Sequence, residues 1–172
     1  MLTRILNTLS KHSSSAGYLQ GMNYIVASLY FHCGEVLAFE LTVRALNDYH
    51  LKEVHMSKLP GLYYHCEVIK TLVRDELPKL HAHFTERKID VFILCQNWVM
   101  TLFTQVIPLG QVQRFFVLFW QDGWLIIYRL ILCIFEKHQE DMLSESDPTT
   151  VQLQMKNSFA MRASQQVMNQ CD

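Results

Sequence analysis

The sequence lacks the cysteine pattern of a secreted or zinc-binding domain. Its five cysteines are odd in number and never form a Cys-x-x-Cys pair; they stand at positions 33, 66, 95, 133 and 171. A disulfide framework or a zinc knuckle needs closer, paired spacing, so we expect free thiols in a reducing compartment. The dipeptides His32-Cys33 and His65-Cys66 could supply four metal ligands. Neighbours on a helix point about 100° apart and rarely chelate one ion, so we expect no metal site.

An excess of one charge and a long apolar run are also missing. The 15 basic and 16 acidic residues give a net charge of −1, without a basic stripe for nucleic acid. The most apolar stretch, residues 115–135, is broken by Gln121-Asp122-Gly123 and carries Arg129, whereas a spanning helix needs about 20 apolar residues. Residues 1–9 lack the apolar core of a signal peptide. These patterns predict a cytoplasmic chain with no nucleic-acid partner and no transmembrane segment.

What the sequence has is helical periodicity. Half of its residues are apolar, enough for the core of one domain, and they recur at steps of three or four. We expect Gly34 to end a helix as a left-handed cap, Pro78 to break one near Glu76, and Asp90 to cap another. No strand pattern or internal repeat is present, so the predicted class is all-α. The predicted helices cover residues 2–9, 22–33, 35–49, 62–84, 91–106, 109–121 and 124–137.

Three further details of this prediction concern the third helix, a loop and the C-terminal segment. Residues Val36, Phe39, Val43 and Leu46 are expected to form one buried face, and residues 51–60 a loop. After residue 143 a polar stretch leads to Asp147-Pro148, which is typical of a helix start. The final helix would either dock on the domain or await a partner. We therefore divide the chain into a domain over 1–143 and a polar linker with a C-terminal helix over 144–172.

One short stretch combines two glycines, an amide and the start of an apolar helix. Residues 17–24 read Gly-Tyr-Leu-Gln-Gly-Met-Asn-Tyr. Gly17 and Gly21 allow the backbone to approach another surface closely, and Gln20 would stand at the mouth of a helix. A side-chain amide both donates and accepts hydrogen bonds, so it could hold an attacking water while contacting a phosphate. From these residues alone, the simpler interpretation that Gln20 caps the next helix is favoured.

Four blocks in order change that interpretation, because they resemble the TBC domain, an all-helical module that binds Rab-type GTPases and speeds their GTP hydrolysis. Residues 18–23 resemble its Y-x-Q-G-M/L-N signature, 78–84 its P-x-L-x-x-H-L block, 98–103 its W-F-x-T-L-F block, and 114–132 its closing R-x-W-D…E-G-W…F-R stretch. The resemblance implies that Gln20 acts in trans on the nucleotide of a GTPase. It also implies a set of residues that bind the GTPase or position the loop, namely Gly17, Tyr18, Gly21, Met22 and Asn23.

The same resemblance implies the partner and the cofactors. The partner would be a Rab-family small GTPase, and the chain would serve vesicle trafficking in the cytoplasm. Attachment to endomembranes would be peripheral, through that partner. GTP and Mg²⁺ belong to the GTPase, so the chain itself is expected to need no cofactor and to activate a partner enzyme rather than be one.

The sequence departs from the family pattern in two places. The family's second catalytic finger is an arginine in an I-x-x-D-x-x-R motif upstream of the glutamine, and residues 1–172 contain no such motif. The sequence begins at a point that matches the helix after that motif, and we expect Arg4 to be a solvated helix residue. This predicts weak stimulation by the chain alone. A shortened isoform, an incomplete gene model and a non-catalytic Rab-binding or scaffold module remain open. The second departure is Phe116-Val117, where the family has Trp-Asp.

Overall fold

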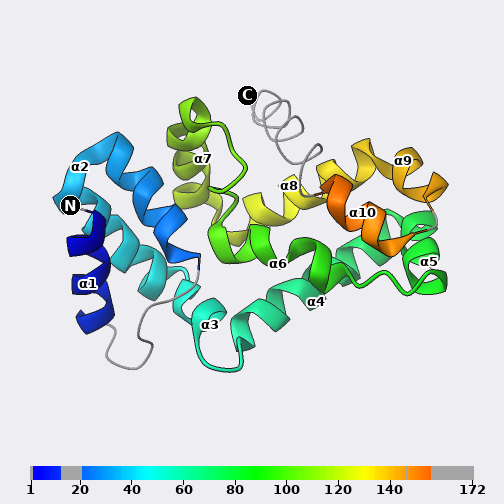
Figure 1. The fold of residues 1–172 in the computed structure, drawn as a ribbon, viewed down its shortest axis with the longest axis horizontal. Coiled ribbons are helices and arrows are strands. Elements are labelled where there is room, and N and C mark those ends of the chain that lie inside the picture. The colour runs from blue at the N-terminus through cyan, green and yellow to red at the C-terminus, as the bar shows by residue number, and fades with distance from the viewer. Residues whose placement is uncertain (1, 13–20, 146, 156–172) are drawn as a thin grey trace.

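The computed structural model describes residues 2–12, 21–145 and 147–155, and every regular element within them is a helix (Figure 1). The predicted all-α class is therefore confirmed. In chain order the elements are α1 Leu2–His12, α2 Met22–Asp48, α3 Leu51–His55, α4 Pro60–Glu76, α5 Pro78–Glu86, α6 Val91–Thr101, α7 Leu109–Asp122, α8 Trp124–Lys137, α9 Gln139–Ser144 and α10 Pro148–Gln154.

Helix α2 is kinked at Gly34, the residue predicted to end a helix. Gly34 has φ 77° and ψ −177°, an extended conformation with positive φ that is essentially limited to glycine. It is therefore a kink between two helical halves rather than the expected left-handed cap. Among the described residues, α2 is the one helix long and apolar enough by length and composition to cross a membrane. Each half alone is shorter than the about 20 residues that a crossing needs.

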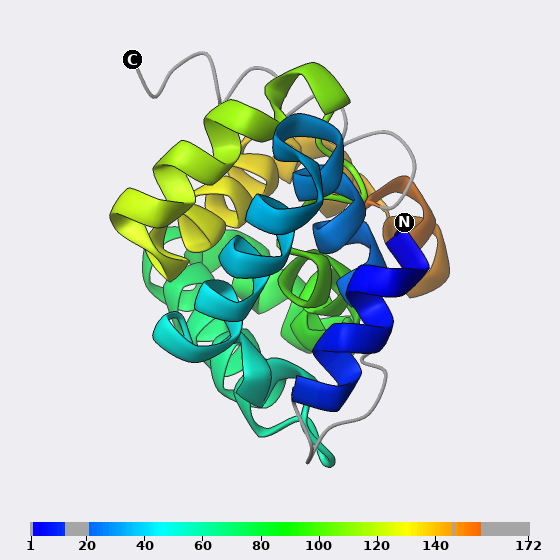
Figure 2. The same cartoon turned by 90° about the vertical axis from the view of Figure 1, so that its left-hand side faces the viewer.

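The buried face of the second half of α2 shares only Leu46 with the predicted one. Small residues face the core, namely Ala38, Thr42 and Ala45, and the Thr42 hydroxyl donates to the Ala38 carbonyl at 2.7 Å. Val36 is 73% exposed, so its predicted burial is wrong. Small side chains allow neighbouring helices to approach closely, and α1 lies along α2 (Figure 2). The larger apolar residues Phe39 and Val43 are only partly buried beside the core.

The predicted loop over 51–60 contains helix α3. Leu51 and Val54 are fully buried, and His50 has a left-handed backbone (φ 57°) that turns the chain from α2 into α3. The break predicted from Pro78 is confirmed, because α4 ends at Glu76 and α5 begins at Pro78. The short helix α9 was not predicted.

Helices α7 and α8 form the predicted pair with a tight turn at Gly123. Tyr49, at the end of α2, contacts residues on both sides of this turn. The indole Nε1 of Trp124 donates to the Tyr49 carbonyl at 2.7 Å. The Tyr49 hydroxyl donates to the Trp120 carbonyl, also at 2.7 Å. The Tyr49 ring lies 5.0 Å from that of Phe119. These contacts join the last third of the domain to its first third.

The two histidines considered as metal ligands have structural contacts instead. His65, on α4, stacks on Trp124 with ring centroids 3.6 Å apart, and its Nδ1 lies 2.6 Å from the Tyr128 hydroxyl. His32 Nε2 lies 3.0 Å from the Leu109 carbonyl oxygen. In the part of the chain that the structure describes, no three His, Cys, Asp or Glu residues gather where they could hold a metal. Burial raises the pKa of the Cys66 thiol to about 12, which makes it a poor nucleophile.

His65 makes stability depend on pH. The side chain is buried, and that burial lowers its pKa from 6.5 to about 4. A base whose pKa falls on folding binds its proton more readily when unfolded, so its contribution is intact above about pH 6.5 and is lost between pH 6.5 and 4. The loss amounts to about 3 kcal/mol, at 1.36 kcal/mol per pKa unit. We expect His65→Gln to flatten the stability curve by about this amount.

Urea unfolding of both proteins at steps between pH 7 and 4 measures this difference. Other titrating groups are common to the two chains, so only the difference between their curves reports on His65. Parallel curves would show that the protonation of His65 does not contribute.

Candidate functional site

The described part of the glutamine stretch begins at Gly21. Gly17, Tyr18 and Gln20 lie outside the described residues. Gly21 has a left-handed backbone, with φ 92° and ψ −19°, and directly precedes α2. Its carbonyl accepts a hydrogen bond from the Tyr24 N–H at 3.2 Å. Of the predicted loop-positioning residues that are described, Met22 is buried in the core and Asn23 is half-buried.

Gly21 rests against the C-terminal end of α6. A Cβ at this position would lie 3.3 Å from the Met100 carbonyl oxygen and 3.4 Å from Cγ2 of Thr101. Both this close contact and the positive φ favour glycine. The close backbone approach expected of Gly21 is thus made, within the described residues, to the chain's own helix α6.

Helix α6 ends in a buried left-handed turn. Its start is as predicted, because the Asp90 side chain accepts a hydrogen bond from the Phe92 N–H at 2.9 Å. Its end is at Thr101 rather than at residue 106, since Leu102 and Phe103 have φ of 46° and 58°. Each left-handed residue other than glycine costs about 1–2 kcal/mol, which burial of a large apolar side chain can offset at about 1.5–3 kcal/mol.

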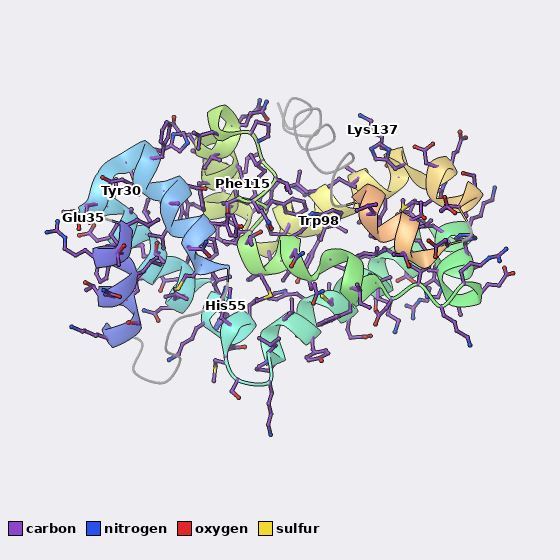
Figure 3. The ribbon with its side chains drawn as sticks, in the orientation of Figure 1. Tyr30, Glu35, His55, Trp98, Phe115 and Lys137 are labelled. Atoms are coloured by element: carbon purple, nitrogen blue, oxygen red, sulfur yellow. The ribbon has the colours of Figure 1, made fainter. Side chains whose placement is uncertain are left out.

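Both side chains of this turn are fully buried. Phe103 stacks on Trp98 with centroids 5.3 Å apart, and Trp98 points from α6 into the middle of the molecule (Figure 3). The Thr104 hydroxyl donates to the Thr101 carbonyl at 2.6 Å. The support under Gly21 is therefore a packed turn, and sequence reasoning missed it because neither glycine nor proline marks the position.

Arg4, the one arginine that precedes Gln20 in the sequence, forms an ion pair. It extends from α1 to Glu35 on α2, and its side chain is largely exposed. The hydrogen bond from Arg4 lowers the pKa of the Glu35 carboxyl. Exposed pairs of this kind add little to stability. Arg4 is the exposed helix residue that the sequence suggested, with a carboxylate as its partner.

The departure at Phe116-Val117 falls on a groove between α2 and α7. Phe116 is buried and stacks on Trp120 with centroids 5.8 Å apart, so phenylalanine keeps an aromatic contact in the core. Val117 is half exposed. It lies with Leu29 and Trp120 at a cavity of about 160 Å³. The residue that replaces the family's aspartate therefore sits at the surface.

Comparison with known proteins places these features in a family. The Rab-GTPase-TBC domain model matches residues 1–143. The Rab GTPase-activating protein eat-17 of Caenorhabditis elegans is 27% identical over 143 residues, which are 83% of this chain and 16% of that protein. The GTPase activating protein Gyp51 of Schizosaccharomyces pombe is 30% identical over 142 residues, 83% of this chain and 14% of that protein. The chain thus spans about a sixth or less of these relatives.

Solved structures agree with the sequence comparison. The flagellar RabGAP TBC domain of Chlamydomonas superposes with a TM-score of 0.79 at 25% identity, covering 97% of this chain and 56% of that one. The Ypt/Rab-GAP domain of Gyp1p has a TM-score of 0.80 at 13% identity, covering 99% and 66%, and supports the fold alone. With the matching family model over most of its length and the matching helical architecture, this chain belongs to the Rab-GTPase-TBC domain family.

Proposed function

We propose that this chain binds a GTP-loaded Rab-type GTPase and promotes hydrolysis of the bound GTP through Gln20. The observation that carries the proposal is the close approach of Gly21 to the C-terminal end of α6. Gly21 directly follows Gln20 in the sequence, and it lies close to the C-terminal end of α6, which leads into a buried turn. A side chain that positions water must be held within a fraction of an ångström, and a well-packed residue directly after Gln20 supports the assignment of that role to it.

The chemistry assigned to Gln20 is orientation of the attacking water. Its amide accepts a hydrogen bond from the water and donates one toward the phosphoryl group. The GTPase supplies GTP and Mg²⁺, and the chain contributes no cofactor. The proposed place of action is the cytoplasm and the endomembrane surfaces where such a partner resides.

Replacement of Gln20 tests this role. We expect Gln20→Ala to remove the stimulated part of the hydrolysis rate, so that the rate returns to that of the Rab protein alone, because positioning by one residue contributes up to about 10²-fold. Binding of the GTP-loaded partner should stay within about threefold. Single-turnover hydrolysis against a panel of Rab proteins, with a parallel binding titration, measures both quantities.

A non-catalytic binding or scaffold module is the second candidate. It is favoured by one observation, namely that residues 1–172 contain no I-x-x-D-x-x-R motif. In that case Gln20→Ala would leave both binding and hydrolysis unchanged, and the parent chain would bind a Rab protein without accelerating its turnover.

A further inference from the structure

We propose that the GTPase partner also docks on the face where α4 and α6 meet, with Tyr63 and Phe92 as its apolar anchor. An adjoining cleft lined by Lys70 and Lys88 would receive an acidic side chain of the partner. This inference rests on the proposed function, because it assigns a surface to the same partner.

The anchor is an aromatic pair that the domain does not cover. The rings of Tyr63 on α4 and Phe92 on α6 stack with centroids 4.8 Å apart and planes 21° apart. Phe92 packs partly on the core, whereas Tyr63 is 56% exposed and the neighbouring Ile93 41% exposed. Two adjacent helices thus present an exposed apolar patch in which Phe92 is held by its packing on the core. Large aromatic residues set in such a patch are typical of the residues that dominate binding at protein interfaces.

The cleft continues this patch along α4. Residues 63, 67 and 70 are spaced by four and three and therefore share one helix face. Beyond Lys70 lies a cavity of about 350 Å³, whose lining includes Lys70, His81, Thr85, Lys88 and Asp90. The Asp90 carboxylate accepts a hydrogen bond from the Phe92 N–H, and Lys70 has a long, exposed contact of 3.6 Å with Glu67. The two lysines outnumber the single acidic group in the cavity, so it suits an anionic side chain.

Helix α6 carries residues of both this surface and the candidate site, a short distance apart. A Cβ at Gly21 would lie 3.3 Å from the Met100 carbonyl oxygen, and Phe92 precedes Met100 by eight residues, which is about 12 Å of helix. One side of a standard protein interface covers about 800 Å², equivalent to a disc of about 16 Å radius. Helices α4 and α6 lie together across the middle of the molecule (Figure 1). A GTPase seated with its nucleotide beside Gly21 is therefore large enough to reach the Tyr63–Phe92 pair.

Substitutions on the two parts of this surface test the inference. We expect Tyr63→Ala to weaken binding of a Rab protein loaded with a slowly hydrolysed GTP analogue by at least about tenfold, and Tyr63→Phe, which keeps the ring, by no more than about twofold. Lys70→Glu combined with Lys88→Glu should slow association about tenfold at low salt, with a smaller effect at high salt. Phe31→Ala is the matched control, since Phe31 is 66% exposed and follows Tyr30, which Figure 3 places at the α1–α2 end.

Each outcome decides the matter. Binding by Tyr63→Ala within twofold of the parent, with a normal thermal melt and with Gln20→Ala removing the stimulated part of the hydrolysis rate, would overturn the docking face and leave the proposed function standing. A parent chain that binds no member of the Rab panel would overturn both. If the parent sediments as a dimer and Tyr63→Ala as a monomer, the face joins two copies of the chain and the inference is wrong.

Discussion

The 172-residue chain is expected to accelerate GTP hydrolysis at least about 10³-fold less than an activator that carries both fingers. An arginine finger neutralises charge on the phosphoryl group in flight and contributes about 10³–10⁵ in rate. The Gln20 amide can place a water but carries no charge. Residues 1–172 contain no I-x-x-D-x-x-R motif whose arginine could supply the positive charge.

Single-turnover hydrolysis measures this deficit, with the Rab protein alone as the baseline. Arg4→Ala serves as the control, because Arg4 is paired with Glu35, and we expect it to change the rate less than twofold. Rate enhancement by the unmodified chain comparable to that of a two-finger activator would contradict the prediction. If Arg4→Ala then abolished that enhancement, Arg4 would be the missing finger.

Gly61→Ala is expected to destabilise the fold by about 2 kcal/mol or more, because overpacking a tight contact costs about 1–3 kcal/mol and occasionally more. Gly61 lies in the first turn of α4, where a Cβ would come within 2.7 Å of the Glu53 carbonyl carbon and of the Val54 nitrogen. These are backbone atoms of α3, so a rotamer change cannot relieve the clash and the two helices must move apart.

Thermal unfolding provides the measurement. For a chain of this size 1 kcal/mol corresponds to about 2–4 °C, so the midpoint should fall by about 4–8 °C. Gly110→Ala is the matched control, because Gly110 is helical and a Cβ added there would meet no atom of another element within 4 Å. It should raise stability by up to about 1 kcal/mol through helix propensity. Equal midpoints for the two variants would show that α3 and α4 can move apart to accommodate the added methyl group without loss of stability.

The helices with strong boundary signals could be predicted from the sequence. Pro78 separated α4 from α5, Asp90 opened α6, and Gly123 divided α7 from α8, each through a local backbone preference that tertiary packing did not override. The Gly34 break was predicted at the correct residue, although with the wrong conformation.

The failures have tertiary causes. The turn at Leu102 and Phe103 adopts a conformation that their side chains disfavour, and their complete burial offsets its cost. The buried face of α2 beyond Gly34 consists mainly of small residues together with Leu46, whereas the periodicity of large apolar residues also indicated Val36. For the candidate site, the sequence could indicate the glutamine stretch through resemblance, but it could not show that Gly21 leans on α6. The roles of Gln20 and of its neighbours stay predictions.

Tyr49 has a consequence for the order in which the domain assembles. Its hydroxyl and carbonyl bond to groups 71 and 75 residues further along the chain. Such long separations in sequence slow folding, because a large loop must close before the contacts form. On the ribosome, the end of α2 must therefore wait for most of the domain to be synthesised before it gains these two bonds. Over that interval its aromatic ring is available to chaperones that recognise exposed apolar groups.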